Sequence, residues 1–366
     1  MKVKNYSKKL SFRKKRNSGK KVLKTIIFII FVGILGFVGY SAAGPVIDFF
    51  AGNFSFNSSS EVIPPEDASV PSSQDDTSST SESSEIEINN SEYNVFILPV
   101  KALESKSALE KALKKLNDEN YQAAAVILKE NKTGMLTYRS KNAYANERRA
   151  VDDNSMKLST IYETIKNQGL YPIAKIYTFT DHIDDNNRDN VYVYSNGARW
   201  FASQRDNEKI WLNPYTAAAR KYIADISKEI SNAGFDTIIF DGVEFPTNLI
   251  SDVHNNEDKL SAEEALSAAV EEAEKASKAK IIRTINASEL LQKTSRRYGG
   301  NVFDIETENI LLNFDDPILK LKRAQLRDLL SDIEYMETFI AVPDNSSGRK
   351  AAETAEQEGF SLIAKY

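Results

Sequence analysis

The residues of this sequence that could carry chemistry are carboxylates placed directly after short apolar runs. In GFDTIIFDGVEFP (residues 234–246), such a run leads into Asp241, and Glu244 follows three residues later. Asp181 and Asp344 follow other apolar runs in the same way. Carboxylates can act as acid, base or nucleophile, although an aspartate after a strand also caps turns. Glycoside hydrolysis needs two carboxylates, about 5 Å apart in retaining enzymes and farther apart in inverting ones. The sequence does not decide between these two geometries.

Aromatic residues gather in the long segment from residue 181 to residue 215. It contains both tryptophans of the chain, Trp200 and Trp211, and it ends at Tyr215. Flat aromatic rings stack on the apolar faces of sugars and bury large areas. The same rings could instead pin a long loop onto the protein, and the two roles are compatible. Lys129 ends another apolar run, where it could donate to a substrate or pair with a carboxylate.

Composition excludes several kinds of site. With no cysteine and only His182 and His254, thiolate metal sites, cysteine nucleophiles and three-histidine sites are impossible. The run DHIDDNNRDN lacks the spacing of an EF-hand loop, so we expect neither a metal nor a cofactor. About ten of the 47 basic residues lie in residues 1–21, which leaves about 37 basic against 52 acidic residues in the body. An acidic body argues against a nucleic-acid partner.

The body of the chain alternates strand-like and helical patterns. Predicted strands lie at residues 93–100, 121–130, 171–179, 235–241, 280–285, 308–314, 336–343 and 359–366. Predicted helices lie at residues 105–117, 158–169, 216–234, 261–277 and 347–359, with capping boxes at Ser107–Glu110 and Ser261–Glu264. Short, continuously apolar strands are typical of parallel, buried strands. The pattern predicts an α/β fold, a (β/α)8 TIM barrel, with a doubly wound open sheet as the competing fold.

The N-terminal quarter predicts a membrane anchor. Residues 1–21 form a basic tail, and within residues 22–47 the run 25–47 has about 23 consecutive uncharged positions, long enough as a helix to cross a bilayer. The basic flank predicts a cytoplasmic N-terminus and an extracellular barrel. The alternative is a signal peptide cleaved near Ala43, which would release a secreted protein. Residues 48–92 are rich in Ser, Asp and Glu and predict a disordered linker, and residues 93–366 form the barrel domain.

Four motifs resemble a known family from about Tyr93 to the last residue. They are AKIYTFTD, NGARWF, WLNPY and AGFDTIIFDGVEFP, and they resemble the "putative glycosyl hydrolase" domain family DUF4015. The resemblance implies a TIM barrel with activity on carbohydrate, and it matches Asp241, Asp181 and Asn213 of the WLNPY motif to family positions. Ile127 stands where the family has an acid, and Glu244 stands where it has an arginine.

These observations predict an extracytoplasmic glycosidase that acts on a polysaccharide or cell-envelope glycan. Its predicted catalytic residues are Asp241, Glu244 and Asp181. Its predicted substrate-binding residues are Trp200, Trp211, Asn213, Tyr215, Lys129 and Asp344. The expected partners are a carbohydrate and, through residues 22–47, the lipid bilayer. Two alternatives stay open, namely a catalytically degenerate barrel that binds glycan and a structural protein of the cell envelope.

Overall fold

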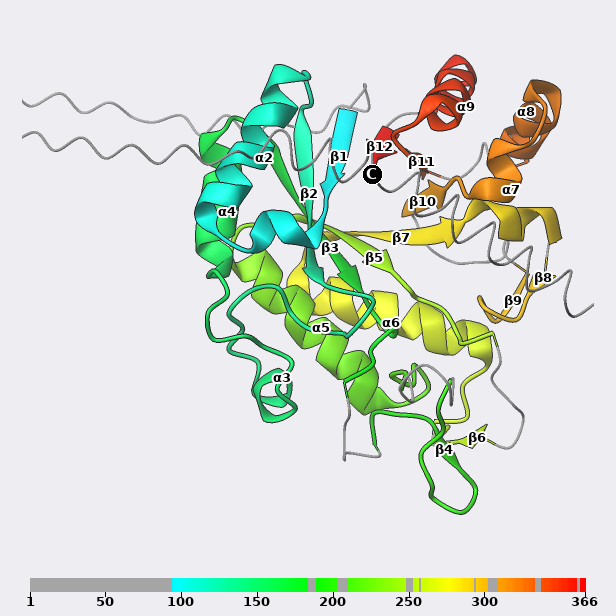
Figure 1. Ribbon diagram of the computed structural model, residues 1–366. Helices are drawn as coiled ribbons and strands as arrows, with labels where there is room; N and C mark the ends of the chain where they lie inside the picture. The colour runs from blue at the N-terminus through cyan, green and yellow to red at the C-terminus, as the bar shows by residue number, and fades with distance from the viewer. Residues whose placement is uncertain are drawn as a thin grey trace, which may run out of the picture. The chain divides into compact units, whose positions relative to one another are not determined.

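The central feature of the fold is a closed barrel of eight parallel strands (Figure 1). The computed structural model describes residues 94–183, 189–202, 210–247, 253–256, 258–292, 294–301, 309–332, 337–360 and 363–366. Around the barrel the strands follow the order β1-β12-β11-β10-β7-β5-β3-β2. Their bounds are β1 Asn94–Leu98, β2 Ala123–Lys129, β3 Tyr171–Tyr177, β5 Thr237–Asp241, β7 Lys280–Asn286, β10 Asn309–Asn313, β11 Glu337–Val342 and β12 Ile363–Lys365. All eight predicted strands are therefore confirmed, and the barrel forms rather than the open sheet.

Helices alternate with these strands along the chain. They are α2 Lys106–Asp118, α3 Ala143–Glu147, α4 Leu158–Asn167, α5 Ala217–Asn232, α6 Ala262–Ser277, α7 Asp316–Leu319, α8 Arg323–Ser331 and α9 Ser346–Gln357, with 3-10 helices at Val100–Leu103 and Ala287–Gln292. The long helices α5 and α6 pack side by side next to β5 and β7 (Figure 1). The five predicted helices are confirmed. The sequence analysis does not predict α8, which buries only three leucines and so shows a short pattern.

Small and branched residues fill the inside of the barrel. Because side chains alternate along a strand, every second residue points inward. The inward cluster consists of Val95, Ile97, Ala123, Ala125, Ile173, Ile239, Ile282, Leu311, Phe339, Ala341 and Ala364. Alanines on β2, β11 and β12 leave room for the larger side chains of the other strands. The opposite faces of the strands pack against the helices, so both sides of the sheet are buried.

The structure contains one of the two predicted capping boxes and lacks the other. At α6 the Oγ of Ser261 accepts the Glu264 N–H at 3.1 Å, and Glu264 accepts the Ser261 N–H at 2.6 Å. This capping box is confirmed. At α2 the predicted Ser107–Glu110 box is wrong, because Ser105 is the N-cap and its Oγ accepts the Ala108 N–H at 3.1 Å. Ser105 has the extended backbone that an N-cap requires, whereas Ser107 already lies inside the helix.

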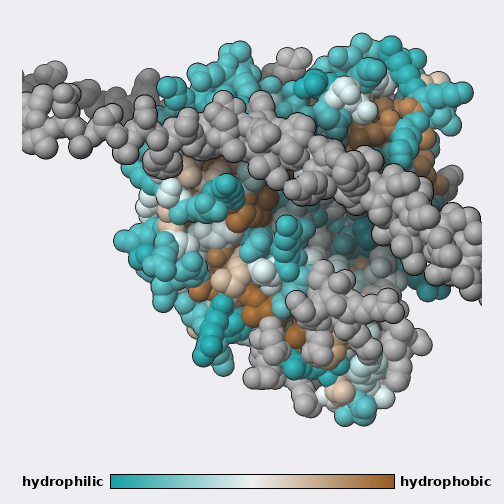
Figure 2. Space-filling view, in the orientation of Figure 1, coloured by the Kyte–Doolittle hydropathy of each residue, from teal (hydrophilic) through white to brown (hydrophobic). Residues whose placement is uncertain are grey.

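Two short antiparallel sheets of two strands each lie outside the barrel. One pairs β4 (Val193–Tyr194) with β6 (Val253–His254), and the other pairs β8 (Thr294–Ser295) with β9 (Gly300–Asn301). Among the described residues visible in Figure 2, the surface is mostly hydrophilic and hydrophobic residues appear in separate patches. None of the helices within the described ranges is long and apolar enough to cross a membrane. The predicted tail, membrane span and linker (1–21, 22–47 and 48–92) lie outside those ranges.

The position of the α2 cap gives a test of the fold. Replacing Ser105 by Ala removes the acceptor for the Ala108 N–H, so Ser105→Ala should lower the free energy of unfolding by about 1 kcal/mol. Ser107→Ala is the matched control, and it should change that free energy by less than about 0.5 kcal/mol. Urea unfolding of the full chain, followed by circular dichroism, measures both changes. A larger loss in Ser107→Ala would contradict the observed start of α2.

Candidate functional site

The alternation of side chains places a set of polar residues at the mouth of the barrel. Lys175 and Tyr177 continue the inward face of β3, and Asp241 continues that of β5. Asn286 of β7 and Asn313 of β10 follow the same alternation, and the amide of Asn313 donates to Asn286 at 3.0 Å. Carboxyl ends of the strands carry the active site in barrels of this kind. On these four strands, the described residues at the mouth are thus one carboxylate, one lysine, two amides and a tyrosine.

An ion pair joins the lysine and the carboxylate at the mouth. Lys175 Nζ lies 2.8 Å from Asp241 Oδ2, and the Lys175 ammonium also lies 5.0 Å from the ring centre of Tyr177. The Lys175 side chain is nearly buried, while that of Asp241 keeps 25% of its surface exposed. Burial alone would lower the pKa of Lys175, but Asp241 and Tyr177 outweigh it and raise that pKa. Lys175 thus holds one side of the Asp241 carboxylate, and the other side is open to solvent.

Glu244 follows Asp241 by three residues but lies in a different environment. Gly242 turns the chain with a φ of +68°, where an added Cβ would come within 2.7 Å of the Thr180 hydroxyl. Burial raises the pKa of Glu244 to about 7, and it does so against the opposing effect of Arg297, whose Nε lies 3.6 Å from Glu244 Oε2. The carboxylate of Asp241 raises this pKa further. Glu244 therefore retains a proton close to neutral pH.

The β8–β9 turn supplies the partners of Glu244. The Phe245 N–H donates to the Arg297 carbonyl oxygen at 2.7 Å, which docks this turn beside the segment after β5. The Tyr298 hydroxyl accepts the Asn286 N–H at 3.1 Å, and a hydrogen bond from Tyr298 lowers the pKa of Glu244. Burial raises the pKa of Tyr298 itself, so its hydroxyl stays protonated and can donate.

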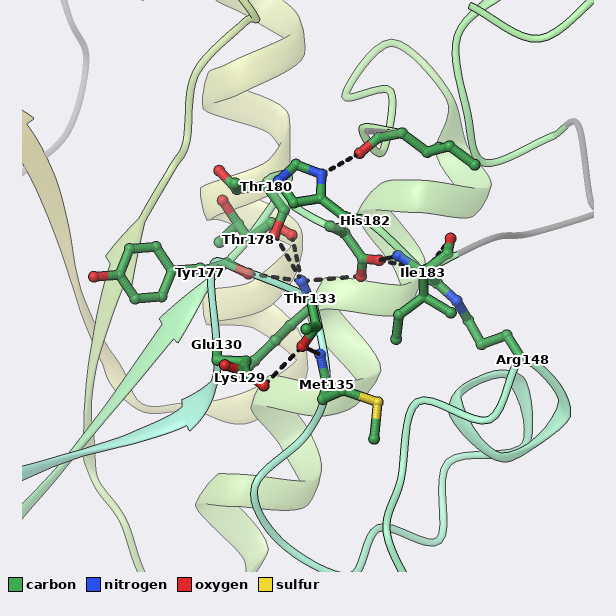
Figure 3. Close-up of polar contacts among 12 residues, drawn as sticks. Lys129, Glu130, Thr133, Met135, Arg148, Tyr177, Thr178, Thr180, His182 and Ile183 are labelled. Carbon is green, nitrogen blue, oxygen red and sulfur yellow. Dashed lines mark hydrogen bonds and ion pairs between the residues drawn. The ribbon is translucent and has the colours of Figure 1, made fainter. Parts of the chain in front are cut away.

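The predicted catalytic residue Asp181 and the predicted substrate contact Lys129 lie together in a buried cluster. Figure 3 shows the Lys129 ammonium at the centre of the polar contacts. Lys129 Nζ lies 3.0 Å from Asp181 Oδ2 and donates to the Tyr177 and Thr178 carbonyl oxygens at 2.8 and 3.1 Å. Arg148 donates to the other carboxylate oxygen of Asp181. Both Asp181 and Lys129 are fully buried, so this cluster ties the loop after β2 to the end of β3 and presents no free face.

The aromatic segment after β3 divides into a buried part and an exposed part. Trp200 is only 3% exposed and packs edge-on against Tyr192, with ring centres 5.6 Å apart. Asn213 is fully buried, where its side chain accepts the Tyr215 N–H at 3.1 Å. The half-buried Tyr215 ring lies 5.1 Å from the ring of Phe245. These residues pin the segment onto the barrel, while Trp211 keeps part of its surface exposed.

A pocket of about 520 Å³ opens beside Glu244. Trp211, His182, Lys132 and Arg297 line it together with Glu244. The Nδ1 of His182 lies 2.7 Å from the Ile210 carbonyl oxygen, which can only accept, so Nδ1 carries the proton. The pocket thus combines a carboxyl group, an aromatic ring and two cations, and its volume is typical of a site for a small molecule.

Of the predicted site residues, Glu244 and Trp211 line this pocket. Asp241 lies at the mouth of the barrel, close enough for its carboxylate to raise the pKa of Glu244. Asp344 lies at the rim instead, where it is partly exposed and pairs with Arg349 at 3.3 Å. Sequence reasoning missed Lys175, although a lysine inside the apolar run YPIAKIY is a usable signal. It also missed Arg297 and Tyr298, for which the sequence offers no periodic signal. Within the described ranges, histidines and acidic residues form no group of three that could hold a metal ion.

Comparisons with known proteins agree with this architecture. Residues 95–299 match the model of the family described as "Putative glycosyl hydrolase domain" (DUF4015). The glycoside hydrolase domain of PgaB (BpsB) from Bordetella bronchiseptica is 11% identical with a TM-score of 0.53, and the match covers 75% of this chain and 94% of that one. This likeness shows the fold alone. No curated protein matches the chain in sequence.

Two further solved structures resemble the chain more weakly. A hypothetical protein from Ruminiclostridium thermocellum ATCC 27405 is 21% identical with a TM-score of 0.45, covering 51% of this chain and 96% of that one. The alpha-galactosidase TtGalA from Thermus thermophilus is 12% identical with a TM-score of 0.46, covering 75% of this chain and 57% of that one.

The buried cluster predicts a large effect on stability. Asp181→Asn leaves Lys129 and Arg148 as buried cations without their counter-charge, and it should lower the free energy of unfolding by about 3–5 kcal/mol. Asp225→Asn is the matched control on the exposed face of α5, and it should cost less than about 0.5 kcal/mol. Urea unfolding of the full chain measures both. Similar losses in the two variants would contradict the role of Asp181 as a structural anchor.

The raised pKa of Glu244 predicts that stability falls as the pH rises. The folded-state pKa of about 7 lies above the ordinary glutamate value of 4.5, so the stabilisation is fully present below about pH 4.5 and is lost as the pH rises through 7. The total change is about 3 kcal/mol. Unfolding midpoints between pH 4.5 and pH 8 measure it, and Glu244→Gln should remove this part of the slope. Glu110→Gln, on exposed α2, is the control and should leave the slope unchanged.

Proposed function

The chain belongs to the "Putative glycosyl hydrolase domain" family, and from that premise we propose that it hydrolyses glycosidic bonds with Glu244 as the general acid and Asp241 as the second carboxylate. The observation that carries the proposal is the contrast between Asp241, the last residue of β5, and Glu244, three residues after it. Asp241 is ion-paired with Lys175, whereas burial raises the pKa of Glu244 to about 7. A carboxyl group that keeps its proton near neutral pH can act as the acid, and a second carboxyl group that a cation holds in place can act as its partner.

The reaction follows from the proton that Glu244 holds and from the ion pair that keeps Asp241 in place. The protonated Glu244 donates to the glycosidic oxygen, so the leaving group departs as a neutral alcohol. The Asp241 carboxylate either attacks the anomeric carbon or takes a proton from the attacking water. Glu244 regains its proton from water in the course of the cycle. Lys175 holds one oxygen of Asp241 at 2.8 Å and leaves the carboxylate partly exposed for the substrate.

The pocket beside Glu244 supports a sugar as the ligand. Trp211 contributes a partly exposed ring to it, which can stack on the apolar face of a pyranose. The volume of about 520 Å³ accommodates a ligand of sugar size. Trp200 and Asn213, in contrast, are buried, and we assign them to holding the segment in place.

We also propose that the barrel acts outside the membrane and is tethered by residues 22–47. The support is the uncharged apolar run, the basic residues before it and the Ser-, Asp- and Glu-rich residues 48–92 after it. This arrangement would present the barrel to a cell-envelope glycan or an extracellular polysaccharide.

A second candidate function is glycan binding without catalysis. The observation that favours it is the placement of the other carboxylates: Asp181 is sealed between Lys129 and Arg148, and Asp241 already has a lysine at 2.8 Å. In this case the ion pair with Lys175 would keep Asp241 from taking part in a reaction. The ring of Trp211 and the cations of the pocket would then serve only to bind the glycan.

Hydrolysis assays on the full chain separate these two functions. A panel of polysaccharides is followed by reducing-end release and by binding. We expect turnover in the native chain, and a loss of about 10²–10⁴-fold in Glu244→Gln and in Asp241→Asn. Turnover should decline above about pH 7, where Glu244 loses its proton, and this decline should be absent from the residual activity of Glu244→Gln. Asp225→Asn is the control with native turnover.

Two outcomes would contradict the hydrolase proposal. Turnover that survives in both variants would show that other residues perform the chemistry. Binding without turnover in the native chain, unchanged in Asp241→Asn, would favour the binding protein.

A further inference from the structure

The pocket beside Glu244 carries two cations from different parts of the chain. Arg297 belongs to the β8–β9 turn, and its side chain is 27% exposed. Lys132 belongs to the turn after β2 and is exposed. Both line the pocket that contains Trp211. Among the residues that the structure describes, Lys132 forms no ion pair, and the carboxylate that pairs with Arg297 is Glu244 at 3.6 Å.

Resting on the proposed hydrolase function, we propose that this pocket selects glycans with an anionic group, held by Arg297 and Lys132 while a sugar ring stacks on Trp211. The anion is a carboxylate, as in a uronic acid, or a phosphate. The planar guanidinium of arginine offers paired donors that match both groups, and a lysine adds a point charge. A neutral sugar would leave Lys132 without a counter-charge in the pocket, and Arg297 as well whenever Glu244 is protonated.

The charge balance of the working enzyme strengthens this inference. The proposed acid is neutral before it donates its proton, and a neutral Glu244 no longer offsets the charge of Arg297. The pocket then holds two positive charges and a ring. A partly buried guanidinium is costly without an anion, so the state that is ready for catalysis is also the state that most favours an anionic ligand.

Binding of the anion should therefore be linked to the protonation of Glu244. Arg297 lowers the pKa of Glu244, and a ligand anion at Arg297 would weaken that effect. Linkage requires the reverse as well, so protonation of Glu244 tightens anion binding. The titratable and charged groups that act on Glu244 are Arg297 and Tyr298 of the β8–β9 turn, Glu289 of the 3-10 helix after β7, Asp241 of β5 and Arg283 of β7. Of these groups, only Arg297 lines the pocket.

The test compares three monosaccharides that differ in charge, namely glucuronate, glucose 6-phosphate and glucose. Binding to the full chain is measured at pH 6 by calorimetry and by tryptophan fluorescence, which Trp211 reports. We expect at least one anionic sugar to bind about tenfold or more tightly than glucose, which corresponds to about 1.4 kcal/mol. Tighter binding of glucuronate identifies a carboxylate, and tighter binding of glucose 6-phosphate identifies a phosphate.

Variants connect the preference to the two cations. Arg297→Gln and Lys132→Gln should each reduce the preference for the anionic sugar. Lys275→Gln, an exposed lysine of α6, is the matched control and should retain it. Because Lys132 is exposed, its variant keeps the test valid even if Arg297→Gln fails to fold. Calorimetry repeated near pH 7.5, where Glu244 is largely ionised in the free protein, in buffers of different ionisation enthalpy should show proton uptake with glucuronate. Glu244→Gln should abolish that uptake while keeping the preference.

The outcomes separate this inference from the proposed function. Equal binding of the three sugars, binding of none of them, or an unchanged preference in Lys132→Gln and Arg297→Gln overturns the anionic substrate. Hydrolysis of neutral glycans without an anion preference would do the same while the hydrolase function stands. An anion preference that depends on both cations, in a chain without turnover, supports the anionic ligand and counts against the hydrolase.

Discussion

The closure of eight parallel strands into a barrel is the constraint on which the rest of the site depends. It brings the carboxyl ends of all strands to one rim, and the alternation of side chains then decides which residues reach the mouth. Lys175 and Asp241 lie two positions beyond Ile173 and Ile239 of the inner cluster, so both point into the mouth. Arg283 has the opposite parity on β7, and it donates outside the barrel to the Val243 carbonyl oxygen at 3.0 Å.

Two ion-pair systems at the same rim have opposite consequences because their burial differs. Asp181 is enclosed by Lys129 and Arg148 and has no exposed surface, so its ion pairs hold the loop after β2 in place. The added Cβ of any other residue at Gly134 would come within 2.5 Å of the Asp181 carboxyl carbon, which shows how closely that loop is packed. Asp241 keeps a quarter of its side chain exposed and thereby remains available to a ligand.

The sequence predicts the strands well because a barrel buries both faces of each strand, and this produces the continuous apolar runs. Asp241 and Glu244 are likewise accessible to sequence reasoning, since they follow one of those runs directly. The burial of Asp181 cannot be predicted in this way, because it depends on Arg148 from a loop more than thirty positions earlier in the chain. The role of Arg297 is not predicted for the same reason: hydrogen bonds from Phe245 and Asn286, which are distant in the sequence, hold its turn beside Glu244. Local sequence patterns do not predict such contacts between residues that are distant along the chain.

The position of Glu244 shows how this chain differs from the motif that it resembles. That motif carries an arginine where this chain has Glu244, and here a guanidinium comes instead from Arg297 on a separate turn. Placing the acid and the cation on different segments leaves a gap of 3.6 Å between them, which is too long for a hydrogen bond. The pair therefore lowers the pKa of Glu244 only in part, and burial remains the larger effect. A tighter pair would stabilise the ionised carboxylate and remove the proton that the proposed acid needs, so the loose contact is the arrangement that the proposed mechanism requires at neutral pH.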